Sequence, residues 1–147
     1  MKKKILILLG ANTDLMGKAQ TNLYGGATLE ELIKKINDYS EKCGFETTVF
    51  QSNIEGELVD RLHASKGNCD GIIINAGSYS HYSYAIRDAI SASLVPCVET
   101  HQTNIYAREP FRAKSVLSDV CVGVISGFGQ AVYLMALDGM ANLLKGV

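Results

Sequence analysis

Five short apolar runs, separated by stretches of helical periodicity, constrain the fold more than any other feature of this 147-residue chain. The runs that we expect to be strands are Ile5–Leu9, Phe45–Gln51, Gly71–Asn75, Pro96–Thr100 and Val120–Ile125. Runs with little polar alternation are typical of strands that are covered on both faces, as in parallel sheets. Strands that alternate with helices favour a parallel α/β sheet with right-handed crossovers. For a chain this short we expect a flavodoxin-like, five-stranded sheet of order 2-1-3-4-5, with helices on both faces.

The segments between these runs carry signals for the ends of helices. Thr28 and Glu31 have the spacing of a capping box, and Gly44 marks the end of the helix that they begin. The other helices are expected to be capped near Ser52, and to run near Tyr84–Ala92 and about Gln130–Lys145. A polar, glycine-containing loop over residues 10–26 follows the first run. Connections of this length between a strand and a helix are often functional lids.

Composition and charge favour a single globular domain over residues 1–147. Hydrophobic residues make up 47% of the chain and charged residues 20%, which is ordinary for such a domain. The net charge of −1 indicates neither a nucleic-acid partner nor a polybasic membrane patch. The run Ile5–Leu9 is too short for a signal peptide or a membrane span. The 4 cysteines are isolated, which suits reduced thiols in a cytoplasmic protein.

Several common site signatures are missing from the sequence. The 3 histidines lack metal-ligand spacing, so no metal is expected. Neither a P-loop nor G-x-G-x-x-G follows the first run, which argues against a nucleotide or flavin. Ser78 and Ser80 lie near His81, but no G-x-S-x-G elbow surrounds them, so a serine nucleophile is not favoured.

Polar residues gather where the expected strands end. Asn12 follows the first run, Asn75 ends the third, and His81 comes soon after it. Glu99 and His101 come at the end of the fourth run and are two residues apart, so on an extended chain they point to the same side. A carboxylate beside an imidazole orients the ring and raises its basicity. The first, third and fourth strands are neighbours in the expected order, so these side chains converge on the rim where parallel sheets bind ligands.

Two arginines complete this polar segment. Arg108 and Arg112 offer guanidinium forks that suit an anion or a carboxylate. Taken alone, residues 96–112 fit a surface loop with a solvated salt-bridge network equally well. Convergence on the rim favours an active site in which His101 is a catalytic acid or base.

Several segments of the chain match one enzyme family in order and spacing. They are QSNIEGELVD at 51–60, INAGSYSHYSYAIRDA at 74–89 and ETHQTNIYAREPFR at 99–112, with partial matches over 126–137 and 10–26. Through these segments the chain resembles type II 3-dehydroquinate dehydratase over essentially its whole length. The resemblance implies a flavodoxin-like subunit, usually assembled as trimers that build a dodecamer. It also implies anti elimination of water from 3-dehydroquinate, giving 3-dehydroshikimate, with no metal, organic cofactor or Schiff base.

The resemblance also implies catalytic roles. Tyr24, on the lid loop, would abstract the proton in its ionised form. Because a phenol has a pKa of ~10, neighbouring cations must lower it. Asn12, with a bound water, would stabilise the enolate oxygen. His101, oriented by Glu99, would protonate the leaving hydroxyl as a general acid.

The remaining implied roles concern substrate binding. Asn75, His81 and Arg112 would hold the ring hydroxyls. The backbone amides of Gln102 and Thr103 would hold the carboxylate of a small hydroxylated cyclic acid. Asp88 would reach the site of a neighbouring subunit, and Arg108 would lie near the tyrosine.

The lid loop departs from the family's usual G-P-N-L-N-x-L-G-x-R-E-P-x-x-Y-G. The departures are Ala11, Thr13, Asp14, Ala19, Gln20 and Thr21, with Tyr106 further on at a position that is often histidine. Ala19 replaces the cation that normally helps to ionise Tyr24. Asp14 adds a negative charge near the base, which raises the pKa of a tyrosine.

Three hypotheses therefore stay open. The chain is a working type II dehydroquinase with an altered lid, and its activity is weak because Ala19 stands at the arginine position. Alternatively, it acts on a different hydroxylated cyclic carboxylate, or it binds such an acid without catalysis.

Overall fold

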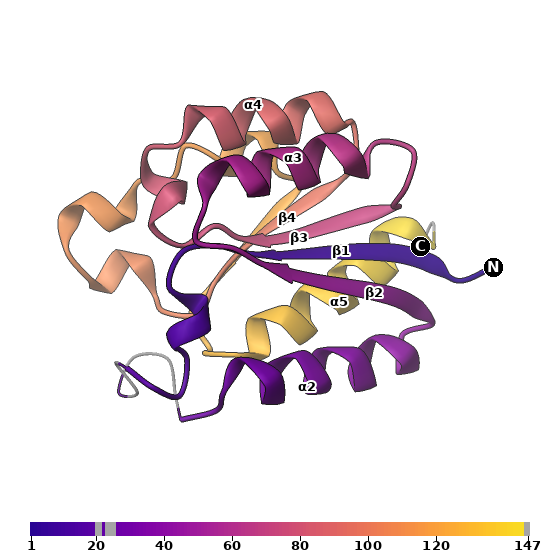
Figure 1. The fold of residues 1–147 in the computed structure, drawn as a ribbon, viewed down its shortest axis with the longest axis horizontal. Coiled ribbons are helices and arrows are strands. Elements are labelled where there is room, and N and C mark those ends of the chain that lie inside the picture. The colour runs from indigo at the N-terminus through magenta and orange to yellow at the C-terminus, as the bar shows by residue number, and fades with distance from the viewer. Residues whose placement is uncertain (20–21, 23–25, 146–147) are drawn as a thin grey trace.

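The computed structural model describes residues 1–19, 22 and 26–145, and these form a five-stranded sheet of order β2-β1-β3-β4-β5 (Figure 1). Its strands are β1 (Lys3–Leu9), β2 (Phe45–Gln51), β3 (Gly71–Asn75), β4 (Cys97–His101) and β5 (Gly123–Ser126). Every neighbouring pair is parallel. The predicted flavodoxin-like order is confirmed.

Helices cover both faces of this sheet. One face carries α3 (Glu55–Ser65) and α4 (Tyr84–Ser93), and the other carries α2 (Leu29–Lys42) and α5 (Ala131–Leu144) (Figure 1). Side chains of β1 alternate between the two layers. Ile7 and Leu9 join the core beneath α2 and α5, whereas Leu6 and Leu8 join the core beneath α3 and α4. Because both faces of β1 are buried, its inner part contains no polar residue.

The predicted N-terminal cap is correct for α2 and wrong for α3. Thr28 and Glu31 form the predicted capping box, with N–H to oxygen distances of 3.2 Å and 2.8 Å. Ser52 does not cap α3 as predicted, because the helix begins only at Glu55. The Ser52 hydroxyl instead donates to the Glu57 carboxylate and accepts from the backbone N–H of Ile54.

The last strand is displaced from its predicted position. The expected strand Val120–Ile125 is observed as β5, Gly123–Ser126, and a short 3-10 turn over Ser118–Val120 precedes it. Val120, the last residue of this turn, packs with Cys121 against the core beneath α3 and α4. Apolar content alone therefore placed the strand too early.

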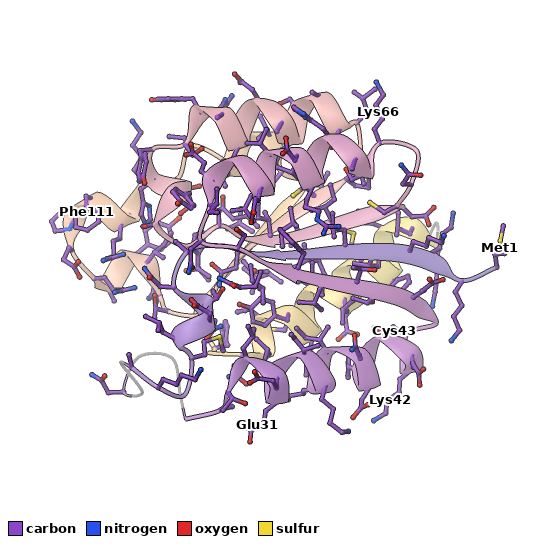
Figure 2. The ribbon with its side chains drawn as sticks, in the orientation of Figure 1. Met1, Glu31, Lys42, Cys43, Lys66 and Phe111 are labelled. Atoms are coloured by element: carbon purple, nitrogen blue, oxygen red, sulfur yellow. The ribbon has the colours of Figure 1, made fainter. Side chains whose placement is uncertain are left out.

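A long excursion between β4 and β5 leaves the sheet at its carboxyl end. Besides the turn over Ser118–Val120, it contains the short 3-10 turns Ile105–Ala107 and Pro110–Ala113. Its Phe111 side chain is 57% exposed and lies at the opposite end of the molecule from Met1 (Figure 2). The excursion carries Arg108 and Arg112 to the edge of the sheet where the strands end.

The carboxyl ends of β1 and β3 approach each other closely. The backbone N–H of Gly10 donates to the carbonyl of Asn75 at 2.7 Å. A Cβ atom on Gly10 would lie 2.3 Å from the carbonyl oxygen of Ala76, so only glycine fits there. Immediately afterwards, Asn12 adopts a left-handed backbone conformation with φ of 70°. These features turn the chain across the rim of the sheet.

Candidate active site

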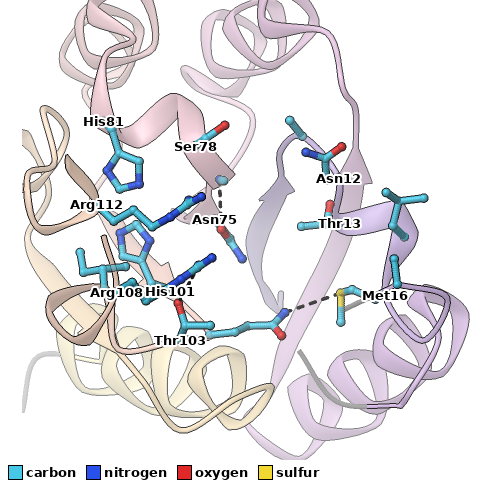
Figure 3. A pocket seen from close by; sticks show the side chains of 16 residues that line it. Asn12, Thr13, Met16, Asn75, Ser78, His81, His101, Thr103, Arg108 and Arg112 are labelled. Carbon is cyan, nitrogen blue, oxygen red and sulfur yellow. Dashed lines mark hydrogen bonds between the residues drawn. The ribbon is translucent and has the colours of Figure 1, made fainter. Parts of the chain in front are cut away.

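A pocket of about 360 Å³ lies at the carboxyl ends of β1, β3 and β4 (Figure 3). The predicted residues that line it are Asn12, Asn75, His81, His101, Gln102, Thr103, Arg108 and Arg112. This volume falls within the range of sites for small molecules. The sheet order thus brings together residues from three separate parts of the chain.

Glu99 lies behind His101 and holds its ring. The His101 Nε2 atom is 2.8 Å from the Glu99 carboxylate, and Glu99 is 1% exposed. Hydroxyl groups of Ser115 and Ser118 also donate to this carboxylate, at 2.6 Å and 3.0 Å. Burial raises the pKa of Glu99, but the hydrogen bonds from His101, Ser115 and Ser118 outweigh it and hold this pKa below its ordinary value. Glu99 is therefore an anion beside the imidazole at neutral pH.

His81 lies beside His101, with the two rings nearly parallel. Their centroids are 6.4 Å apart and their planes differ by 13°. The Nδ1 atom of His81 is 2.7 Å from the carbonyl oxygen of Lys114. Because a carbonyl only accepts hydrogen bonds, Nδ1 carries the proton and Nε2 is left for a ligand. His81 can therefore accept from a hydroxyl group when it is neutral.

Both arginines extend into the same pocket, beside the two histidines (Figure 3). Arg108 donates from Nη1 to the hydroxyl of Thr103 at 3.2 Å. Arg112 donates from Nε to Glu109 at 2.9 Å, and its guanidinium group lies 4.7 Å from the centre of the Phe111 ring. These contacts orient two positive charges toward the cavity, which suits a carboxylate ligand.

Asn75 is held from two sides at the end of β3. Its Oδ1 atom accepts from the backbone N–H of Gly77 at 3.1 Å, and its Nδ2 atom donates to the hydroxyl of Tyr133 at 2.8 Å. The same hydroxyl accepts from Nε2 of Gln102 at 2.9 Å. Burial raises the pKa of Tyr133, although the bonds from Asn75 and Gln102 oppose the shift. Tyr133 is thus a neutral phenol at physiological pH.

The first loop reaches the pocket through Asn12. Its backbone N–H donates to Oδ1 of Asn53 at 2.9 Å, and Nδ2 of Asn53 lies 3.4 Å from the Asp14 carboxylate. Asn53 therefore links the loop after β2 to the loop after β1. The Asn12 side chain is left to line the pocket.

The lid loop is only partly within the described residues. Ala19 lines the pocket, whereas Asp14 does not. The predicted base, Tyr24, lies outside the described residues, as do Gln20 and Thr21. The predictions that concern these three positions therefore stay predictions.

Asp88 does not line this pocket. It lies on α4 and is exposed. This exposed position is compatible with the prediction that Asp88 serves the site of a neighbouring subunit. Contacts within one chain do not test that prediction.

Three supporting residues were missed by the sequence analysis. Ser115 and Ser118 bond the carboxylate of Glu99, and Tyr133 bonds Asn75 and Gln102. The serines lie in an irregular segment, and Tyr133 occupies an apolar position of α5, so neither has a local pattern that reveals its partner. A tyrosine in an otherwise apolar helix face was the available signal, since a buried hydroxyl needs a partner.

Metal-binding and membrane-spanning features are not found in the described part of the chain. No group of three or more potential metal ligands occurs among residues 1–19, 22 and 26–145. No helix formed by those residues has the length and apolar character needed to cross a membrane.

Comparison with known proteins gives one consistent result. The family model described as Dehydroquinase class II matches residues 3–141. A 3-dehydroquinate dehydratase of Thermotoga maritima is 49% identical over 142 residues, covering 97% of both chains. One from Caldicellulosiruptor bescii is 47% identical over 143 residues, covering 97% of this chain and 99% of its own. The type II dehydroquinase structure from Propionibacterium acnes superposes with a TM-score of 0.93 at 34% identity, covering 97% of this chain and 98% of its own.

Proposed function

Because the chain belongs to the class II dehydroquinase family, we propose that it is a hydro-lyase that converts 3-dehydroquinate to 3-dehydroshikimate in the shikimate pathway. The observation that carries this function is the Glu99–His101 pair beside two arginines in one pocket. An elimination of water next to a ketone requires a base, a stabilised enolate and an acid for the leaving hydroxyl. The described residues supply candidates for the last two.

His101 is the proposed general acid. Its Nε2 atom bonds Glu99, so Nδ1 is the ring nitrogen that would deliver a proton to the leaving hydroxyl. Delivery from Nδ1 while Nε2–H stays on Glu99 requires a doubly protonated ring. The Glu99 carboxylate, which is held as an anion, would accept the Nε2–H hydrogen bond during that transfer. The pair thus supports acid catalysis without a metal.

The proposed substrate site follows from the charges and amides of the pocket. Arg108 and Arg112 favour an anionic ligand, and the backbone amides of Gln102 and Thr103 would hold its carboxylate. Asn75 and His81, together with Arg112, would bind ring hydroxyls. Asn12, at the end of the first loop, would stabilise the enolate oxygen through a water molecule.

The proposed base is Tyr24, and its activation is the weak point of the site. Ala19 lines the pocket at the position where the family usually has arginine, so this position brings no positive charge. We propose that dehydration is consequently slow near neutral pH. Asp14 accepts a hydrogen bond from Asn53 and does not line the pocket.

A second candidate function follows from the same residue. With Ala19 in the lid, the pocket would bind a different hydroxylated cyclic carboxylate without dehydrating 3-dehydroquinate. The intact arginines and histidines support binding in either case.

We also propose a trimer-based dodecamer in the cytoplasm. The exposed position of Asp88, outside its own pocket, supports a role toward a neighbouring subunit. Light scattering should give the mass of a trimer or of four trimers, and a 15.9 kDa monomer at micromolar concentration would contradict this assembly.

The decisive experiment is a dehydration assay on the purified protein. 3-Dehydroshikimate contains a conjugated enone that absorbs in the ultraviolet, and the product should be identified by NMR. Enone formation above the buffer control supports the dehydratase. Its absence between pH 6 and pH 10, together with a ligand-induced rise in melting temperature, would favour the second candidate function.

A further inference from the structure

We propose that Tyr133 is a positioning residue, which orients the side-chain amide of Asn75 toward the substrate. Tyr133 lies on α5 and does not itself line the pocket. The proposal rests on the proposed function, because Asn75 matters only if the pocket binds a hydroxylated ligand.

The hydroxyl of Tyr133 is the first observation. The residue is 0% exposed, so a phenylalanine ring would bury the same apolar surface without a polar atom. Burying a hydroxyl is unfavourable unless it is hydrogen bonded. Both amides that bond this hydroxyl, Nδ2 of Asn75 at 2.8 Å and Nε2 of Gln102 at 2.9 Å, belong to residues that line the pocket. The hydroxyl thus serves the pocket rather than the packing of α5.

The geometry of Asn75 is the second observation. Its amide is bonded at both ends, because Oδ1 accepts from Gly77 and Nδ2 donates to Tyr133. Those two bonds use one lone pair of Oδ1 and one hydrogen of Nδ2. The second hydrogen and the second lone pair are then fixed in direction. Without the Tyr133 hydroxyl, the hydrogen bond from Gly77 would be the one restraint on this amide among the described residues.

The Gln102 side chain steadies the hydroxyl itself. Gln102 is 5% exposed, and its Nε2 atom also lies 3.6 Å from the sulfur of Met16. Its backbone carbonyl accepts from the N–H of Gly129 at 2.9 Å. Because Gln102 is anchored at both its backbone and its side chain, its hydrogen bond also restrains the Tyr133 hydroxyl. The three residues thus join β3, the end of β4 and α5.

The first test compares two tyrosine substitutions. Tyr133→Phe removes the hydroxyl beside the pocket. The control Tyr39→Phe removes a hydroxyl on α2 that bonds Asp138 of α5 at 3.0 Å. We expect Tyr133→Phe to raise KM for 3-dehydroquinate by about tenfold, the effect of one lost hydrogen bond, with kcat changed by less than about threefold. Tyr39→Phe should change neither constant by more than about twofold. Equal kinetics for the two variants would overturn the proposal.

A double-mutant cycle shows whether Tyr133 acts through Asn75. In an Asn75→Ala background, Tyr133→Phe should change kcat/KM by less than about twofold, because the amide that Tyr133 orients is gone. An undiminished effect of Tyr133→Phe in that background would overturn the route through Asn75.

The last measurement does not depend on activity. The side-chain amide signals of Asn75, assigned by their loss in Asn75→Ala, should exchange their hydrogens more slowly than those of exposed Asn142. Tyr133→Phe should accelerate the exchange. Exchange of Asn75 as fast as Asn142 in the natural protein would overturn the positioning role, even if Tyr133→Phe failed to fold. Protected Asn75 in a protein without dehydratase activity would support positioning while rejecting the proposed function.

Discussion

The carboxylate of Glu99 lies 2.8 Å from Nε2 of His101, and the two side chains are only 1% and 6% exposed. Such a buried contact fixes the imidazole in one orientation and assigns Nδ1 to the pocket. The hydroxyl groups of Ser115 and Ser118 also donate to the carboxylate, so the folded structure stabilises the charged form of Glu99.

Replacing His101 by alanine should remove the proposed acid. We expect kcat for dehydration to fall by roughly 10²–10⁴-fold, the usual contribution of a positioned acid. Glu99 keeps its bonds to Ser115 and Ser118, so the fold should persist with a loss of about 1–3 kcal/mol in the free energy of unfolding. Exposed His63 on α3 provides the matched control, His63→Ala. Unchanged turnover in His101→Ala would restrict the histidine to binding or packing.

Removing the hydroxyl of Ser115 should make the protein more sensitive to acid. The pKa of Glu99 is lowered in the folded state, so its stabilising contribution is present above the unfolded pKa of about 4.3 and is lost as the pH falls through the folded value. Ser115→Ala raises that folded pKa, so the stabilising contribution of Glu99 becomes smaller and is fully lost at a higher pH. Circular dichroism during acid titration should show a higher unfolding midpoint, and exposed Ser91→Ala should leave it unchanged.

Placing an arginine at position 19 should speed the reaction. An unassisted tyrosine of pKa ~10 is ionised at about one part in a thousand at pH 7, so the missing cation costs up to about a thousandfold in rate. The rate of the natural protein should rise with pH as Tyr24 ionises. Ala19→Arg should raise kcat at pH 7 by at least about tenfold and move the alkaline limb toward neutrality. Ala19→Gln, of similar bulk without charge, should do neither.

Turnover of tens per second by the natural protein at pH 7 would show that another group already lowers the pKa of Tyr24. Failure of both the natural protein and Ala19→Arg at every pH would give first place to the second candidate function.

Binding of a hydroxylated cyclic acid should be measurable without catalysis. Shikimate or quinate at about 100 times its Kd should add about 2.7 kcal/mol to the free energy of unfolding and raise the melting temperature by several degrees. Arg112→Ala should abolish most of that rise, whereas Arg61→Ala, which replaces an exposed residue of α3, should preserve it. No shift at millimolar ligand would contradict the assignment of the pocket.

The sheet and most of the rim could be predicted because their signals are local. Local sequence patterns predict the strand at Ile5–Leu9 and the polar residues at the ends of β3 and β4. Parallel pairing then brings distant strand ends together without further information. His81, Glu99 and His101 were placed in this way, and the structure brings them together.

The supporting contacts could not be predicted because they depend on side-chain direction across the fold. Ser118 bonds Glu99 from a 3-10 turn that ends at Val120, the first residue of the predicted last strand. Tyr133 reaches Asn75 across 58 residues of sequence, from a helix face whose pattern indicates only burial. Hydrophobic periodicity encodes which face is buried and carries no information on where a hydroxyl points.

The contact between Gly10 and Ala76 has a consequence for redesign of the substrate range. One missing methyl group lets the ends of β1 and β3 touch, with 2.3 Å between a hypothetical Cβ and the carbonyl oxygen. A library that selects for larger or smaller ligands should therefore find position 10 intolerant of every substitution. Accepted changes should instead collect at positions such as Ala19, where the wall of the cavity is a side chain and not two touching backbones.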